Sequence, residues 1–284
     1  MNGKTKSTII VSILWLIVLG GAIMVFLPFL WMVLTSFKPP DEVMTIPPKW
    51  IPSKFYWQNY PFVWSYKFGA PLWWRYYFNS VIVAVTQVSG VLLTSSLAAY
   101  AFARINFFAR DTIFMLYLAT MMIPGTVTLI PLYLLIQRFG WLDKYQALII
   151  PGLAGAYGTF LLRQFFMTIP QELEDAAYVD GASRFYTYWK IILPLGKPGL
   201  TALGLFTFMG SWNSFLWPLI VTTSDKMRTL PLGLSMLRRT GGWVRIEWGA
   251  LMAASTMAII PILILFICAQ EYFIGGISLT GMKE

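Results

Sequence analysis

Three carboxylates, Glu172, Glu174 and Asp175, stand close together just after Pro170. Neighbouring carboxylates can work as an acid–base pair, bind a metal ion, or present negative charge to a partner protein. The chain has no histidine and one cysteine, Cys268, so the sequence lacks the usual metal ligand, the neutral-pH proton carrier and any redox pair. The position of these carboxylates just behind a proline favours the start of a helix, where the helix dipole stabilises negative charge.

The residues around these carboxylates predict a short helix, a bend and a second short helix. Pro170 suits the first turn of a helix, and the helix dipole favours acidic residues close behind it. Residues at three- and four-residue spacing then share one face: Leu173, Ala176, Ala177 and Asp180. Gly181 ends this helix, and the aromatic run 185–189 resumes helix until Pro194. Small side chains on the first helix would let another protein approach its backbone closely, whereas the alternative is an amphipathic helix lying on the membrane.

This segment resembles the EAA signature of bacterial ABC-importer permeases. The resemblance is carried by Asp-Ala-Ala at 175–177, Gly181, and Ile-x-Leu-Pro at 191–194. The leading glutamate of the signature is an aspartate here, which keeps the charge on a side chain one carbon shorter. In that family the loop is cytoplasmic and docks into a groove on the ATPase subunit. The resemblance implies that coupling to the ATPase falls to Glu172, Glu174, Asp175, Ala176, Ala177, Asp180, Gly181 and Ala182.

The composition of the chain indicates a membrane protein. Hydrophobic residues make up 57% of its 284 residues and charged residues only 12%, whereas an ordinary globular domain carries about 25% charged residues. The net charge of +9 is common among membrane proteins, because lysines and arginines hold helix ends at anionic headgroups. No basic cluster is dense enough to indicate a nucleic-acid partner. We therefore expect an all-α protein in contact with membrane lipid.

Charged residues divide the chain into apolar stretches, and about 20 apolar residues in helical form cross the hydrocarbon core of a bilayer. We predict one transmembrane permease domain over 1–284 with six transmembrane helices, at about 9–35, 77–103, 112–137, 145–167, 199–223 and 248–272, and a helix-Gly-helix coupling hairpin at 170–192. The first stretch is too long for the core of a secretion signal, so we expect it to be retained. Prolines and glycines inside the stretches indicate either ordinary buried helices or helices broken around a water-lined path.

Amide and indole side chains inside the predicted spans are candidates for the solute path. Uncharged polar groups beside flat aromatic rings suit a neutral polyhydroxylated solute, and no uncompensated charge lies deep in a span. The candidates are Gln87, Trp212, Asn213 and Trp217. The alternative is that these groups hold neighbouring helices together by hydrogen bonds.

Further segments resemble the carbohydrate branch of these permeases, above all the smaller, maltose-type subunit. They are Pro170-x-Glu172-Leu173, Asp180-Gly181-Ala182, 212–219, 230–234 and the ending 281–284. The resemblance implies a heterodimer with a second permease subunit, two ATPase subunits and an extracytoplasmic solute-binding protein. It also implies that this chain binds no cofactor, that ATP and Mg are bound by the ATPase subunits, and that the solute is a sugar or related polyol.

The resemblance implies the inner membrane of a bacterium, with both termini in the cytoplasm, since the hairpin is cytoplasmic in that family. The balance of lysine and arginine between the two faces leans weakly the other way, so charge alone does not support this orientation.

Two other classes of protein stay open at this point. An ion-coupled carrier for a small polar solute would need buried carboxylates, and only Glu271, at the end of a span, comes near. An intramembrane enzyme would need a nucleophile with a base, or a metal site, which a chain without histidine supports poorly. The chain has no Gly-x-x-x-x-Gly-Lys-Ser/Thr phosphate loop, so any ATP must be hydrolysed by a partner.

Overall fold

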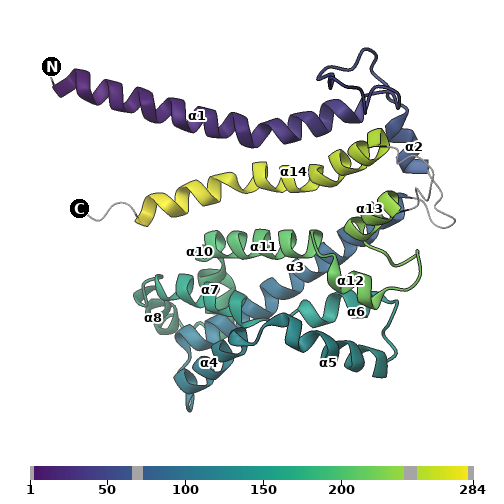
Figure 1. Cartoon of the computed structure of the whole chain (residues 1–284). Helices are drawn as coiled ribbons and strands as arrows, with labels where there is room; N and C mark the ends of the chain where they lie inside the picture. The colour runs from purple at the N-terminus through teal and green to yellow at the C-terminus, as the bar shows by residue number, and fades with distance from the viewer. Residues whose placement is uncertain (1–2, 66–72, 240–247, 281–284) are drawn as a thin grey trace. The chain divides into compact units, whose positions relative to one another are not determined.

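The computed structural model describes residues 3–65, 73–239 and 248–280, which Figure 1 shows as a set of helices. No residue in these three ranges belongs to a strand. The prediction of an all-α protein is therefore confirmed. The chain forms two compact units, one of Met1–Trp73 with Leu234–Ile260 and the other of Trp74–Gly233 with Pro261–Glu284.

The helices in the described part of the chain are of three kinds, α, 3-10 and π. They are α1 (Gly3–Ser36), α2 (Asn59–Ser65), α3 (Trp73–Arg104), α4 (Arg110–Ala119), η1 (Thr120–Met122), α5 (Gly125–Arg138), α6 (Tyr145–Ile149), η2 (Ile150–Gly152), α7 (Ala156–Met167), α8 (Glu172–Val179), α9 (Arg184–Thr187), η3 (Tyr188–Ile192), α10 (Leu193–Leu195), α11 (Lys197–Trp212), α12 (Leu216–Val221), α13 (Leu230–Arg239) and α14 (Trp248–Thr280). Of these, η1 and η2 are 3-10 helices and η3 is a π-helix.

Within the ranges that the structure describes, three helices are each long and apolar enough to cross a membrane: α1 over Ile10–Ser36, α3 over its whole length, and α14 over Trp248–Gln270. Three bent pairs raise the number to six if each pair is one span: Arg110–Met122 with Gly125–Arg138 (95°), Tyr145–Gly152 with Ala156–Met167 (42°), and Arg184–Leu195 with Lys197–Trp212 (76°). The last pair differs from the stretch predicted at 199–223. In the structure α11 ends at Trp212, and α12 is a separate short helix.

Prolines lie both inside continuous helices and at breaks between helices. Pro28, Pro131 and Pro261 all lie inside continuous helices, as membrane helices tolerate. Pro124 has an extended backbone and separates η1 from α5. The break between η2 and α7 ends at Gly155, which also has an extended backbone and directly precedes the first residue of α7. Continuous helices and breaks therefore both occur, and a water-lined path beside the breaks stays a prediction.

In the first unit, the segment after α1 folds back onto the end of that helix. The side-chain amide of Asn59 donates to the carbonyl oxygens of Ser36 (2.8 Å) and Lys38 (3.1 Å). The ammonium group of Lys38 lies 3.8 Å from the centre of the Trp31 ring, a cation–π contact. Burial lowers the pKa of Lys38 more than the nearby charge of Glu42 raises it. These contacts fix the position at which α1 ends.

In the second unit, α3 contributes to the core along much of its length. One core cluster around it comprises Val91, Ala99, Tyr100, Leu162, Phe166, Ile169, Tyr188, Ile192 and Leu203. Glycine permits the close packing, because a Cβ added at Gly158 would lie only 2.5 Å from the hydroxyl oxygen of Ser95. The hydroxyl of Thr94 also donates to the carbonyl oxygen of Leu153 across the break before α7. Helix α3 is thus the element against which the candidate functional segments are positioned.

Candidate functional site

The carboxylates that open the hairpin lie in the first turn of a real helix. Helix α8 begins at Glu172, directly after Gln171, and its first turn contains Glu172, Glu174 and Asp175. Their negative charge faces the positive end of the helix dipole, which stabilises the helix start. The short helix predicted behind Pro170 is therefore present.

Helix α8 ends in a Schellman motif centred on Gly181. The amide N–H of Ala182 donates to the carbonyl oxygen of Ala177 (2.9 Å), and that of Gly181 donates to the carbonyl oxygen of Tyr178 (3.0 Å). Gly181 has φ +82°, in the left-handed region that favours glycine, and a Cβ added there would meet no atom within 4 Å. The glycine is needed for the backbone conformation of the bend, and the space beside it is open.

The second half of the hairpin is less regular than the single helix that the sequence predicted. The hydroxyl of Ser183 accepts a hydrogen bond from the amide of Tyr186 (3.3 Å) and so caps α9. The π-helix η3 and the one-turn α10 follow. The hydroxyl group of Tyr188 in η3 lies 2.8 Å from that of Ser96 in α3, and this contact joins the second half of the hairpin to α3.

Glu174 points toward the protein interior, whereas its neighbours in α8 point outward. Its side chain is 3% exposed, and its carboxylate forms an ion pair with the guanidinium of Arg104 at the end of α3, with Nε and Oε1 2.8 Å apart. The hydroxyls of Tyr100 and Tyr178 donate to the same carboxylate, at 3.4 and 3.5 Å. The sequence grouped Glu174 with the docking residues, but in this chain it anchors the hairpin.

Arg104 connects a third element to this anchor. Its guanidinium donates to the carbonyl oxygen of Phe166 (2.6 Å) near the end of α7 and to that of Ile169. The arginine therefore joins the C-terminal ends of α3 and α7 to the first turn of α8. Sequence reasoning did not identify Arg104 as functional, although a charged residue that closes a long apolar stretch is a signal that it needs a partner.

The outward face of the hairpin carries acidic, small and apolar side chains together. The exposed residues of α8 and the bend are Glu172, Leu173, Asp175, Ala176, Tyr178, Val179, Asp180 and Gly181, with Ala177 and Ala182 half-buried beside them. Val179 is 88% exposed, which is unusual for an apolar side chain on a charged helix. The aromatic rings of Phe185, Tyr186 and Trp189 are also at least half exposed. An apolar and acidic surface of this kind is typical of a protein interface.

The four residues predicted for the solute path lie near the break between α11 and α12, and two of them meet at α6. Gln87 donates to the carbonyl oxygen of Leu148 (2.8 Å), and the indole of Trp217 donates to that of Ala147 (2.8 Å). The ring of Trp212 is buried. Asn213 is exposed and donates to the carbonyl oxygen of Met209 (2.9 Å), which closes the end of α11.

A small polar cavity of about 100 Å³ lies beside Gln87 and Trp217. Its polar lining is completed by Ser80, Ser211, Ser214 and Thr229. A water molecule occupies about 30 Å³ in the liquid, so this cavity matches a few water molecules rather than a sugar. The contacts to α6 fit the helix-bridging alternative for Gln87 and Trp217, and the role of the four residues in the solute path stays a prediction.

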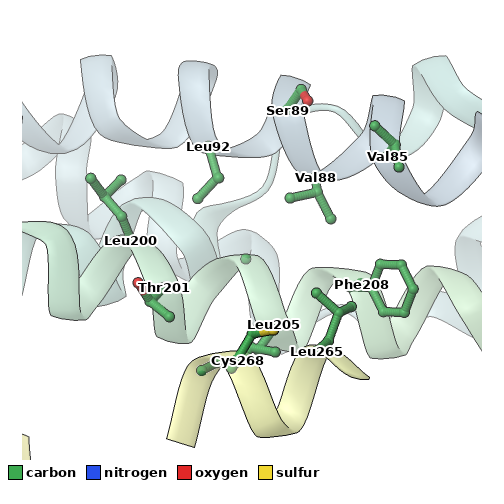
Figure 2. A pocket seen from close by; sticks show the side chains of 12 residues that line it. Val85, Val88, Ser89, Leu92, Leu200, Thr201, Leu205, Phe208, Leu265 and Cys268 are labelled. Carbon is green, nitrogen blue, oxygen red and sulfur yellow. The ribbon is translucent and has the colours of Figure 1, made fainter. Parts of the chain in front are cut away.

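A second, larger cavity of about 490 Å³ lies between α3, α11 and α14. Figure 2 shows that its walls are mainly aliphatic, with Leu92 of α3 and Leu200 of α11 pointing toward one another and Leu265 of α14 closing a third side. Its few polar groups include the hydroxyl of Thr201 and the thiol of Cys268. Such a lining suits apolar chains better than a hydroxylated solute.

Comparison with known proteins identifies the family. Residues 90–278 match the family described as "Binding-protein-dependent transport system inner membrane component". The arabinooligosaccharides transport system permease protein AraQ of Halalkalibacterium halodurans is 37% identical over 99% of both chains. The sn-glycerol-3-phosphate transport system permease protein UgpE of Yersinia enterocolitica is 34% identical, over 90% of this chain and 92% of its own length.

The fold is similar to that of a solved ABC importer. A chain of a bacterial ABC transporter involved in the import of the acidic polysaccharide alginate aligns with a TM-score of 0.82, over 96% of this chain and 99% of its own length. The identity of 22% makes this a likeness of fold alone. The family match and the relatives nevertheless span most of the chain. The chain therefore belongs to the binding-protein-dependent transport system inner membrane components, the non-catalytic, multi-pass permease subunits of ABC importers.

Proposed function

We propose that this chain moves a sugar or related polyol across the inner membrane of a bacterium, as one of two different permease subunits. The relatives named for arabinooligosaccharides and for sn-glycerol-3-phosphate support this solute class, because both solutes carry hydroxyl groups. Membership in an ABC permease family favours the ATP-driven importer over an ion-coupled carrier and over an intramembrane enzyme.

The outward face of the hairpin is the observation that carries the proposal. Exposed Asp175, Asp180 and Glu172 present negative charge beside the small side chain of Ala176 and the exposed Val179. A groove on an ATPase subunit with basic rims and an apolar floor would complement this face. The ion pair of Glu174 with Arg104 keeps this face turned outward. A displacement of α8 by the ATPase therefore also displaces the membrane helices to which α8 is bound.

The remaining partners follow from this docking. Two ATPase subunits bind ATP and Mg and hydrolyse the nucleotide, and this chain binds no cofactor itself. With the hairpin in the cytosol, both termini are cytoplasmic, and residues 139–144 and 222–229 face the other side, where an extracytoplasmic solute-binding protein delivers its cargo. The second permease subunit supplies the other wall of the solute path, and this chain contributes Gln87, Trp212, Asn213 and Trp217.

The energy source for uptake tests this proposal. Cells that lack this chain should lose uptake of a radiolabelled arabinooligosaccharide, of maltose or of glycerol 3-phosphate, and a plasmid copy should restore it. Depletion of cellular ATP should stop the restored uptake, whereas a protonophore given while ATP is maintained should leave most of it. Uptake that survives ATP depletion and stops with the protonophore would indicate an ion-coupled carrier and overturn the proposal.

A further inference from the structure

We infer that α3 carries the movement of the hairpin across the membrane to the segment 222–229, here called the far loop. The inference rests on the proposed docking of the hairpin to an ATPase. It goes beyond that proposal because it assigns the transmission to one helix and to named contacts at its two ends. All residues involved belong to the second compact unit.

The C-terminal end of α3 is bound to the hairpin by several contacts. The Arg104–Glu174 ion pair and the hydrogen bond from Tyr100 to Glu174 fix the first turn of α8 to this end. The hydroxyl contact of Ser96 with Tyr188, one turn earlier, fixes the second half of the hairpin. A displacement of the hairpin must therefore move the end of α3 with it, because both halves are held.

The N-terminal end of α3 is bound in the same manner to the far loop. The side-chain amide of Asn79 donates to the carbonyl oxygens of Lys226 (2.9 Å) and Arg228 (2.8 Å). The hydroxyl of Ser80 accepts a hydrogen bond from the amide of Leu230 (2.8 Å), just past the loop. Asn79 and Ser80 are both buried, so water does not compete for these hydrogen bonds.

The far loop is itself held in shape, so it can respond as a unit. The carboxylate of Asp143 accepts hydrogen bonds from the amides of Thr223 and Ser224, both at 2.9 Å. Burial raises the pKa of Asp143, but these hydrogen bonds and the charge of Arg228 outweigh it and leave the pKa below its ordinary value. Asp143 is therefore ionised near neutral pH. The ion pair between Arg228 and Asp225 closes the other part of the loop.

Helix α3 is long enough to join the two faces without interruption. Its 32 residues extend about 48 Å, which exceeds the roughly 30 Å hydrocarbon core of a bilayer. Figure 1 shows α3 passing from α6 and α12 at one end to α7 and α8 at the other. The spans that lie wholly within residues 74–233 of this unit, other than α3, are bent pairs, whereas α3 is continuous. A continuous helix transmits a displacement along its axis better than a broken one, which can flex at the break.

The test separates two causes of a lost response: a less stiff α3, and the removal of two side chains from it. Val85 and Leu93 lie between the two sets of end contacts, and both side chains are more than half exposed in this chain. The double variant Val85→Gly/Leu93→Gly weakens the helix, and Val85→Ala/Leu93→Ala removes nearly the same side chains but keeps a strong helix former. Both variants also carry Cys268→Ser and Thr223→Cys. The rate at which an impermeant maleimide labels position 223 then reports the accessibility of the far loop. The complex is purified through a tag on this chain, and labelling is timed with and without a non-hydrolysable ATP analogue.

We expect the analogue to change the labelling rate at position 223 by about fivefold or more in the parent and in the alanine pair, as for other coupled sites. The glycine pair should lose this change while retaining the bound ATPase subunits. A glycine pair that responds like the alanine pair would overturn the role of α3. A loss of response in both pairs would assign the coupling to side-chain contacts and also overturn it. No response in the parent, with ATPase subunits bound, would also overturn the transmission to the far loop. A parent chain that recovers no ATPase subunit would overturn the proposed docking itself.

Discussion

Replacing Gly181 with aspartate should abolish solute uptake and reduce the amount of ATPase subunit that co-purifies, while the chain still inserts into the membrane. The substitution adds a carboxylate beside Asp180 on the exposed tip of the hairpin, where a Cβ has open space within this chain. The left-handed backbone at φ +82° costs an aspartate about 1–2 kcal/mol at most, which a packed hairpin can tolerate. The defect should therefore arise at the surface that meets the ATPase.

Gly140 provides a matched control for this substitution. It also has a left-handed backbone, with φ +66°, and an added Cβ there meets nothing within 4 Å. Gly140→Asp therefore introduces the same charge and a similar backbone strain in the connection between α5 and α6, away from the hairpin. Recovery of the ATPase should stay near the parent value. Normal uptake in Gly181→Asp, or equal losses in both variants, would count against the docking role.

Removing one partner of the Arg104–Glu174 ion pair should also have a large effect. Breaking a buried pair costs about 3–5 kcal/mol because it leaves an uncompensated charge. Here Arg104→Ala also leaves the carbonyl oxygen of Phe166 without this donor. We expect a lower melting temperature of the purified complex and severely reduced uptake. The exchange Arg104→Glu with Glu174→Arg should recover part of both, because it restores the opposite charges.

Arg110 provides the comparison for the ion pair. Its guanidinium lies 3.1 Å from the carboxylate of Asp111, whose side chain is 73% exposed. Exposed pairs contribute about 0–1 kcal/mol, so Arg110→Ala should change the melting temperature and uptake little. If Arg104→Ala behaves like Arg110→Ala, or if the exchanged pair recovers nothing, the hairpin is not held in place by these opposite charges.

The ends of the hairpin helices could be predicted because local residues determine them. Pro170 and the carboxylates behind it favour a helix start, and Gly181 supplies the left-handed residue that a Schellman motif needs. The inward direction of Glu174 could not be predicted. All three carboxylates satisfy the helix dipole equally well, and only Arg104, 70 positions earlier in the chain, selects Glu174 for burial.

The break between α11 and α12 was harder to foresee than the other breaks. The span predicted at 199–223 includes Pro218, yet the helix stops at Trp212, and Pro218 lies inside the first turn of α12. Proline is tolerated in a first turn because its missing N–H has no partner there. The residues at the break, Asn213 to Phe215, carry no strong helix-breaking signal, so tertiary contacts such as that of Trp217 with α6 must favour it.

The side of the membrane on which the hairpin lies tests the central claim most directly. Val179→Cys in a Cys268→Ser background places a single thiol at an 88% exposed position on α8. Thr223→Cys in the same background places one on the far loop. We predict that an impermeant maleimide labels position 179 in inverted membrane vesicles stripped of ATPase subunits but not in intact cells, and that position 223 shows the reverse. Labelling of position 179 from outside intact cells would contradict the account, because no ATPase in the cytosol could then reach the hairpin.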